Sequence, residues 1–535
     1  MGLKIYNDLI GATNKGKFPA IQGASWSSNM FLEENGGQNY MASLPGLKLE
    51  RNTGIRGRVQ GVYVSSVGQT SIGGAPEMFA VVNGKVLRFT QAGQMSVIGN
   101  VSVNNARVSF AESGGLRPFL LIADGQNLFA WNLTESYWMQ IQLPPKAMGD
   151  TGQVAPSFVA CVDGSIVVND VGTNYFYFST RFPLNTETRT VFDMSGGEVQ
   201  YESDGITVKT VDLPSESIVF LDSYQVPQYH SSYSAADNID ALAAVGDMLY
   251  VFGTGTVELW QRGSGEYEQW LRTSYTANLS NGVEAPFSVA VNKTEIFYVG
   301  AGTSFAKGVM MASGADYKKI SPDWLDKKLL ETGSQNAYGF CYSVGEHQFY
   351  CLQLPGIHET WCYDVFSGQW HQRQSRDRDN GTEMQWRVQG MAWWKEKFYA
   401  FCGDGGVYIH DDDYWMEDNV EGQGWPMIRH RQGSVIVDEF KPFILQEVAV
   451  ELNVGTWDSY EIKPMLTLEC SRDGGETFGN RHSVSCGLAG EYSHRVRFHL
   501  GGKTRLCVLR LTYSYPTDLV LSSASIRAVG TACMI

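Results

Sequence analysis

The stretch Met78-Phe79-Ala80-Val81-Val82 places five apolar residues directly before the pair Asn83-Gly84. Asn and Gly tolerate the positive φ angles that the two-residue turn of a tight β-hairpin requires. The same unit, a short apolar run near a Gly, Asn or Asp turn, returns at Phe119–Ile122, Ile166–Val168, Leu249–Phe252, Ile296–Val299, Phe349–Leu352 and Phe398–Phe401. The chain is therefore predicted to consist of antiparallel hairpins.

The spacing of these units indicates the architecture. Most begin about 41 to 53 residues apart, close to the roughly 40–50 residues of a four-stranded propeller blade. One interval is about 83 residues long, and it contains residues 180–235, which carry three prolines among many Ser, Asp and Glu. We interpret that segment as an insertion on one blade. Six or seven blades are expected, and a stack of unrelated β-sandwiches is the alternative.

The parts outside the repeat have different patterns. Residues 1–60 lack periodicity and are predicted to form an extended N-terminal arm, which leaves residues 61–435 for the β-propeller. Residues 436–535 alternate more cleanly, as in Met465–Glu469 and Leu506–Leu511, and this pattern favours a β-sandwich-like C-terminal domain. The predicted fold class is thus all-β, a propeller with an insertion followed by a sandwich.

One helix is predicted. Ser321 suits an N-cap and Pro322 a first turn, and apolar residues follow at helical spacing in Trp324, Leu325 and Leu329.

Composition restricts the function classes. A formal net charge of −15 argues against a protein that grips nucleic acid by its phosphates. The nine cysteines form no Cys-x-x-Cys pair, which argues against a zinc site or a disulfide framework and for synthesis in a reducing compartment. We also expect no signal peptide and no membrane-spanning helix, because no apolar run approaches the necessary length.

Gly11 to Lys17 has the spacing of a phosphate-binding loop. That loop requires Ser or Thr at the next position and a helix after it. Phe18 and Pro19 follow instead, so we expect no nucleotide site there.

Ser471-Arg472-Asp473-Gly474-Gly475-Glu476-Thr477-Phe478 fits the Asp-box pattern of sialidase-like propellers. In that pattern the Asp and Ser side chains bond to the backbone of their own turn. We therefore interpret it as a structural staple. Catalysis on glycans, which would also need an arginine cluster and a tyrosine nucleophile, is the alternative.

Other charged or motif-like stretches have plain structural interpretations. His410-Asp411-Asp412-Asp413 could hold a cation through carboxylates, but it lacks calcium-loop spacing and is predicted to be a solvated turn. Arg373, Arg376 and Arg378 alternate with Asp377 and Asp379 in a mixed-charge loop. No Gly-x-Ser-x-Gly or His-Glu-x-x-His motif is present. The sequence therefore predicts no enzyme, no catalytic, cofactor-binding or metal-binding residue, and no cofactor.

The stretch Trp361 to Trp370 resembles a kelch-type blade. Tyr363-Asp364 would end one strand, Ser367-Gly368 would turn, and Trp370 would start the next strand.

The order of segments carries a wider resemblance. The succession runs Asn29-Met30-Phe31, Leu44-Pro45-Gly46-Leu47, Arg56-Gly57, Asp240-Ala241-Leu242, Val251 to Trp260, Asn281-Gly282, Ile296 to Gly300, Ile320-Ser321-Pro322, Gly345 to Tyr350, the Tyr-Asp…Trp blade, Ser471 to Phe478, Gly490-Glu491-Tyr492 and Arg495-Val496. It resembles the packaged-DNA stabilisation proteins, or tail nozzles, of short-tailed bacteriophages. The resemblance covers most of the chain and is weakest in residues 180–230.

This resemblance implies a structural virion protein made in the host cytoplasm. The family implies a homohexameric ring below the portal and head-to-tail adaptor that retains packaged DNA and later serves as the conduit for genome ejection. Tail fibres or spikes, and a plug protein, are the further partners it implies. Double-stranded DNA would pass through the lumen without sequence-specific binding. An acidic lumen would repel DNA phosphates and let the duplex slide.

Two other classes stay open at this point. The Asp box allows a glycan-cleaving or glycan-binding propeller, and the kelch-like blade allows a monomeric propeller scaffold or lectin from a cell.

Overall fold

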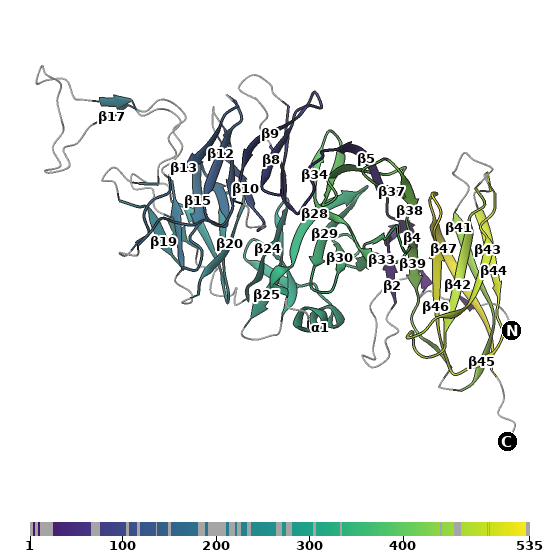
Figure 1. The fold of residues 1–535 in the computed structure, drawn as a ribbon. Helices are drawn as coiled ribbons and strands as arrows, with labels where there is room; N and C mark the ends of the chain where they lie inside the picture. Colours follow the sequence, from purple (N-terminus) through teal and green to yellow (C-terminus); the bar gives the residue numbers. More distant parts are fainter. Residues whose placement is uncertain are drawn as a thin grey trace, which may run out of the picture. The chain divides into compact units, whose positions relative to one another are not determined.

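The computed structural model, shown in Figure 1, describes residues 4–5, 9–10, 25–65, 75–102, 106–114, 118–134, 136–147, 151–179, 188–190, 210–212, 220–221, 226–232, 237–263, 270–273, 281–302, 307–331, 334–438, 441–453, 462–488, 490–491 and 493–530. The chain divides into two compact units. Unit 1 combines Met1–Gly54 with Pro322–Ile535, and unit 2 is Ile55–Ser321. The regular structure of the described residues is almost entirely β-strand, as predicted.

Unit 2 contains five four-stranded antiparallel sheets. The first two are β6 (Val59–Val64), β7 (Met78–Val82), β8 (Lys85–Phe89), β9 (Met95–Asn100) and β10 (Ser109–Glu112), β11 (Phe119–Ala123), β12 (Leu128–Asn132), β13 (Trp138–Ile141). The third is β14 (Val159–Val162), β15 (Ser165–Asn169), β16 (Tyr175–Phe178), β19 (Tyr229–Ser231). The last two are β20 (Ile239–Val245), β21 (Met248–Gly253), β22 (Val257–Arg262), β23 (Trp270–Arg272) and β24 (Asn281–Asn292), β25 (Glu295–Gly302), β26 (Gly308–Ser313), β27 (Asp316–Lys319).

The apolar runs predicted from the sequence form the second strand of every sheet in this unit. They are buried on both sides; β7 and β11, for example, have no exposed residue. The hairpin after β7 turns at Asn83 and Gly84, whose φ angles are +49° and +77°, as a type I′ turn requires.

The insertion enters one of these sheets between its third and fourth strands. β16 pairs directly with β19, with Tyr175 opposite Ser231, although residues 179–228 separate them. Most of residues 180–235 lies outside the described residues. Within it the short strands β17 (Thr188–Thr190) and β18 (Thr210–Asp212) pair with each other.

Unit 1 contributes two more four-stranded arrangements, which makes seven among the described residues and agrees with the predicted six or seven blades. One is β28 (Tyr338–Val344), β29 (His347–Leu354), β30 (Glu359–Asp364) and β31 (Trp370–Gln372). The other is β34 (Val388–Trp394), β35 (Lys397–Cys402), β36 (Gly406–Asp411) and the N-terminal strand β5 (Gly46–Asn52).

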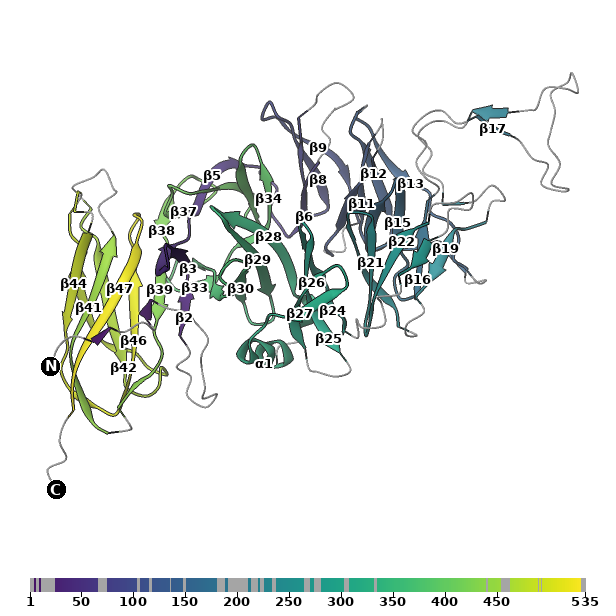
Figure 2. The ribbon, with the colours of Figure 1, turned by 180° about the vertical axis from the view of Figure 1, so that it is seen from behind.

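The C-terminal part of unit 1 forms the β-sandwich (Figure 2). One of its sheets contains β3 (Met30–Asn35), β4 (Gln38–Ser43), β47 (Val520–Gly530), β41 (Phe443–Asn453) and β44 (Ser493–His499), with β1 (Lys4–Ile5) and β45 (Lys503–Thr504) at its sides. The other contains β39 (Arg429–Gln432), β46 (Leu506–Tyr513), β42 (Met465–Ser471), β43 (Gly479–Ser485) and β40 (Ile436–Val437). Buried side chains of both sheets form one hydrophobic core between them.

Smaller elements complete unit 1. Strand β2 (Trp26–Ser28) pairs with both β31 and β39. The hairpins β32 (Gln374–Arg376)–β33 (Glu383–Gln385) and β37 (Met416–Asp418)–β38 (Gly424–Pro426) are additional to the four-stranded arrangements.

The predicted helix is α1 (Asp323–Glu331), which is followed by a 3₁₀ turn, η5 (Ser334–Asn336). The described residues contain no helix with the length and apolarity needed to cross a membrane. The predicted domain boundaries, after residues 60 and 435, stay predictions.

Candidate functional site

The Asp box forms a staple of the predicted kind. The Asp473 carboxylate accepts hydrogen bonds from the backbone amides of Glu476 (3.1 Å) and Thr477 (3.0 Å) and from the Ser471 hydroxyl (2.6 Å). The Ser471 hydroxyl also accepts from the Gly475 amide at 2.8 Å. These bonds, with the Thr477 hydroxyl, hold the pKa of Asp473 well below its usual range. The Asp473 carboxylate therefore stabilises its own turn through these hydrogen bonds.

The acidic stretch at the end of β36 divides between the interior and the surface. His410 is buried, and burial together with the nearby Arg373 charge keeps its pKa well below the ordinary value. Asp411 pairs with Lys397 at 3.4 Å, while Asp412 and Asp413 are exposed. Within the described part of the chain no group of His, Cys, Asp or Glu has the arrangement of a metal site.

The kelch-like segment forms the predicted strand–turn–strand. Asp364 ends β30 and accepts hydrogen bonds from the Phe366 amide (3.0 Å) and the Ser367 hydroxyl (2.6 Å). It also contacts His347 Nδ1 at 2.8 Å. Trp370 begins β31 and is buried beside Tyr363, with ring centroids 5.4 Å apart.

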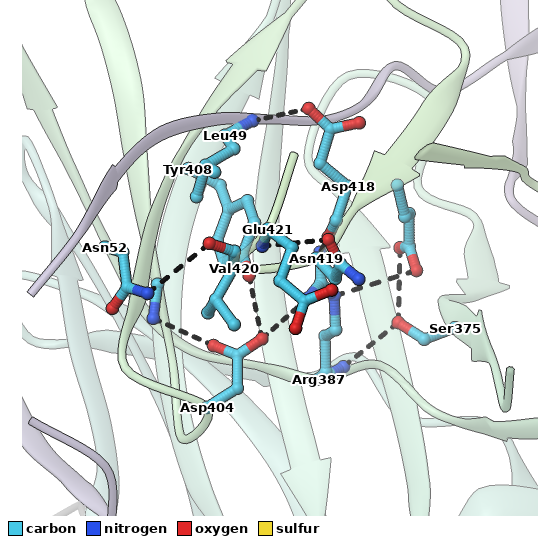
Figure 3. Close-up of polar contacts among 12 residues, drawn as sticks. Leu49, Asn52, Ser375, Arg387, Asp404, Tyr408, Asp418, Asn419, Val420 and Glu421 are labelled. Atoms are coloured by element: carbon cyan, nitrogen blue, oxygen red, sulfur yellow. Dashed lines mark hydrogen bonds and ion pairs between the residues drawn. The ribbon is translucent and has the colours of Figure 1, made fainter. Parts of the chain in front are cut away.

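A network of polar side chains, which the sequence did not single out, lies where the N-terminal strand β5 meets β36 and β37 (Figure 3). We call it the Arg387 cluster. Its members are Ser375, Arg387, Asp404, Tyr408, Glu417 and Asp418.

Arg387 lies at the centre of the cluster. Its guanidinium donates to Asp404 at 3.0 Å and to the backbone carbonyl of Asp418, and it lies 4.2 Å from the centroid of the Tyr408 ring. Glu417 is 3.9 Å from Arg387 Nε. Burial opposes the charge of Arg387, but the neighbouring Cys402, Glu417, Tyr408 and Asp404 side chains together outweigh it and raise the pKa of the guanidinium above the ordinary arginine value.

Two strands far apart in sequence are joined by this cluster. The Asp418 carboxylate accepts a hydrogen bond from the backbone amide of Leu49 in β5 at 2.8 Å. The Asn52 side chain reaches the Val420 carbonyl at 3.4 Å, and the Thr53 amide reaches the Gly405 carbonyl at 2.9 Å. The cluster therefore fastens the N-terminal strand to the four-stranded arrangement that β5 completes.

A groove opens beside the cluster, with a volume of about 400 Å³ counting its opening to solvent. Arg376 and Arg378 of the mixed-charge loop line it, together with Trp425 of the β37–β38 hairpin. Burial and the neighbouring Arg387 charge lower the pKa of Arg378. The third arginine of that loop, Arg373, is fully buried elsewhere. The mixed-charge loop that was predicted from the sequence as one feature thus has two parts: a buried one at Arg373 and one that lines the groove at Arg376 and Arg378.

The sequence had little chance of revealing the Arg387 cluster, because its members come from five separate segments. The one available signal was Asp404-Gly405, which follows the apolar run of β35 as a turn pair. The phosphate-loop-like stretch at residues 11–17 lies outside the described residues.

Comparison with known proteins identifies related families. A family model described as "Bacteriophage P22 Gp10, beta-propeller" matches residues 28–409, and a second, "Bacteriophage P22 Gp10, beta-sandwich", matches residues 429–529. Among curated proteins, none matches this sequence.

Solved structures with detectable likeness include two lyases and one protein of another kind. A streptogramin B lyase has 10% identity and a TM-score of 0.34 over 71% of this chain and 97% of its own. Virginiamycin B lyase from Staphylococcus aureus has 10% identity and a TM-score of 0.37 over 68% of this chain and 98% of its own. BamB from Moraxella catarrhalis has 10% identity and a TM-score of 0.32 over 76% of this chain and 96% of its own. Values this low support no inference about activity.

Proposed function

The chain belongs to the bacteriophage P22 Gp10 family, and on that basis we propose that it forms a tail nozzle that retains packaged DNA. Membership makes it a structural protein of the phage tail. The finer proposal is that six copies assemble as a ring below the portal and head-to-tail adaptor. The ring closes the channel after packaging and later becomes the conduit for genome ejection. The match of both family models, one after the other along the chain, carries this proposal.

The architecture supports a structural role. The described residues form seven four-stranded arrangements of hairpins, and radial repetition of such sheets leaves only short, protected edges, which suits a rigid wall. Head-to-tail contacts that close on themselves would build a ring from identical copies. The polar side chains of the Asp box form hydrogen bonds within the box. Those of the Arg387 cluster form hydrogen bonds within the cluster. We therefore propose that the protein has no catalytic role and needs no cofactor.

Charge supports a passage for DNA. Residues 436–535 carry ten Lys and Arg against eleven Asp and Glu, so nearly all of the net charge of −15 belongs to residues 1–435. If that acidic surface lines the lumen, DNA phosphates are repelled and the duplex slides freely. Replacing lumen-facing acidic residues by lysine is then expected to slow ejection, and an unchanged ejection rate would contradict the acidic-lumen proposal.

Electron microscopy of the protein mixed with portal–adaptor complexes tests the main proposal. We expect sixfold rings on the adaptor, and particles assembled without the protein should lose their DNA to nuclease. Protein that never binds the complex, while it cleaves sialosides or capsular polysaccharide, would overturn the proposal and favour a glycan-cleaving propeller. Protein that ignores the complex but binds sugar or peptide as a monomer would favour a scaffold or lectin.

A further inference from the structure

Three neighbouring strands of unit 1 carry a row of reactive side chains in the protein core. Cys351 of β29 lies directly opposite Cys362 of β30, and Cys362 lies opposite His371 of β31. Both cysteines are free thiols with no exposed surface. Residues directly opposite each other in an antiparallel pair have Cα atoms about 4.5–5.5 Å apart. A disulfide needs about 4.4–6.8 Å between Cα atoms, so the Cα spacing of such a pair is within the range that a disulfide can bridge.

A positive charge is buried next to this row. Arg373 follows His371 by two residues and has no exposed surface. Its guanidinium donates to the Pro45 carbonyl at 3.2 Å, contacts His410 Nε2 at 3.3 Å and lies 4.3 Å from the centroid of the Trp386 ring. None of these groups is anionic, and among the described residues no carboxylate forms an ion pair with Arg373. A buried cation without a counter-charge is costly.

Several polar atoms around Arg373 lack hydrogen-bond partners among the described residues. They are Nε and Nη1 of Arg373 itself and Nε2 of His371. Unpartnered donors of this kind in a packed core need an explanation, and a negative charge nearby is one. Within this row the two thiols are the acidic groups, and the hydroxyl of Tyr342 in β28, a further titratable group beside them, donates a hydrogen bond to Cys362 Sγ at 4.0 Å. Burial alone would raise the pKa of Cys362, but the neighbouring Cys351 and His371 side chains and the charge of Arg373 lower it.

We propose that Cys362 is the thiolate counter-charge of Arg373 and that Cys351 and Cys362 form a redox-active pair, oxidised to a disulfide by peroxide. This inference stands apart from the proposed nozzle function. It assigns Arg373 and His371 as positioning residues that keep the Cys362 sulfur anionic. Thiolate, not thiol, is the form that reacts with oxidants.

The oxidation proceeds in two balanced steps. The Cys362 thiolate attacks one oxygen of hydrogen peroxide, so that an S–O bond forms, the O–O bond breaks and hydroxide leaves. The Cys351 sulfur then attacks the sulfur of the resulting sulfenic acid. The S–S bond forms, the S–O bond breaks, and the departing hydroxide combines with the Cys351 proton to give water. A thiol reductant such as dithiothreitol restores both cysteines. Because Cys362 is buried, the entry of peroxide requires a transient opening of the sheet, whereas the second step joins two sulfur atoms on directly opposite residues.

Hydrogen peroxide treatment of the folded full-length protein, followed by mass spectrometry under non-reducing conditions, tests the pair. Cys161 and Cys341 are better exposed than the pair and serve as internal controls. We expect a Cys351–Cys362 link that dithiothreitol reverses and that forms at least tenfold faster than Cys161 or Cys341 is oxidised. Oxidation of Cys161 and Cys341 while Cys351 and Cys362 remain thiols would overturn the proposal.

Two further measurements test the charge on Cys362. Thiolate absorbance near 240 nm at pH 7 should be present in the wild-type protein, decrease in Cys362→Ala and stay unchanged in Cys402→Ala. The rate of disulfide formation should be nearly independent of pH between pH 6.5 and 8 in the wild-type protein and in Arg373→Lys. In Arg373→Met it should fall about tenfold for each unit of decrease in pH. A wild-type absorbance unchanged by Cys362→Ala would overturn the thiolate assignment even if Arg373→Met does not fold.

Discussion

The backbone amide of Leu49 donates a hydrogen bond of 2.8 Å to the carboxylate of Asp418, which lies 369 residues further along the chain. Asp418 is nearly fully buried and also accepts a hydrogen bond from the Tyr414 hydroxyl. One carboxylate thus holds the N-terminal strand β5 against the β37–β38 hairpin. The stability of unit 1 should depend on that carboxylate.

We expect Asp418→Ala to lower the free energy of unfolding by about 2–3 kcal/mol, because it leaves buried donors without an acceptor. Urea denaturation followed by tryptophan fluorescence measures the change. Asp413→Ala, in the exposed turn after β36, is the matched control and should change stability by less than about 0.5 kcal/mol. Equal effects of the two variants would show that Asp418 does not fasten β5.

Gly46, the first residue of β5, is predicted to tolerate no side chain. A Cβ atom there would lie 2.0 Å from the carbonyl oxygen of Met416, and backbone cannot move aside as a flexible side chain can. We expect Gly46→Ala to cost about 3 kcal/mol or more, seen as a lower urea midpoint or loss of soluble protein. Gly479→Ala has open space around its Cβ position and should leave the midpoint nearly unchanged. A wild-type midpoint for Gly46→Ala would contradict the close approach of β5 and β37.

The sequence predicted the elements that local chemistry determines. An apolar run beside a turn with positive φ angles is sufficient to predict a hairpin from local sequence. Each of the seven runs forms the second strand of a four-stranded arrangement. The Asp box was predictable for the same reason, since the hydrogen bonds that the described residues make to the Asp473 carboxylate come from its own turn and from Ser471.

What the sequence did not predict depends on pairing between distant segments. Leu47 of β5 lies opposite His410, and no local pattern specifies such a partner. The burial of Arg373 was equally hidden, because its neighbours Arg376 and Arg378 have the same residue type and face a groove. Residue type alone cannot distinguish a core arginine from a surface one when the surrounding segments come from across the chain.

The Asp-box staple should survive acid. Hydrogen bonds from Ser471 and Thr477 hold the pKa of Asp473 well below its usual range. Stability from a lowered carboxyl pKa is present above the unfolded-state value, about 3.9, and is lost only as the pH falls through the folded-state value. Hydrogen exchange at the Glu476 and Thr477 amides should therefore stay slow relative to unfolded peptide at pH 3 and become fast in Asp473→Ala. Fast exchange in the wild-type protein at pH 3 would contradict the staple.

The contribution of Asp240 in unit 2 to stability is expected to depend on pH in the opposite direction to that of Asp473. It lies at an irregularity of β20, between Ile239 and Ala241 in the register with β21. Burial, with the negative charges of Asp237 and Glu284, raises the pKa of its carboxyl group from 3.8 to about 6. The folded state then binds this proton more tightly than the unfolded chain does. Ionised Asp240 destabilises unit 2, so the contribution of the protonated Asp240 carboxyl group to the stability of the folded state is lost as the pH rises from about 4 through 6.

Asp240→Asn removes the ionisation and should therefore stabilise the protein at pH 8 but not below pH 4. After allowance for solvent screening of this half-buried group, the gain at pH 8 should be about 1 kcal/mol. Thermal unfolding followed by circular dichroism at pH 4, 6 and 8 measures it. Asp247→Asn alters an exposed aspartate in the turn after the same strand and should show no such pH dependence. An Asp240→Asn variant no more stable than wild type at pH 8 would mean that the carboxylate is well solvated or compensated, for example through the Lys307 side chain that pairs with Glu284 at 2.6 Å.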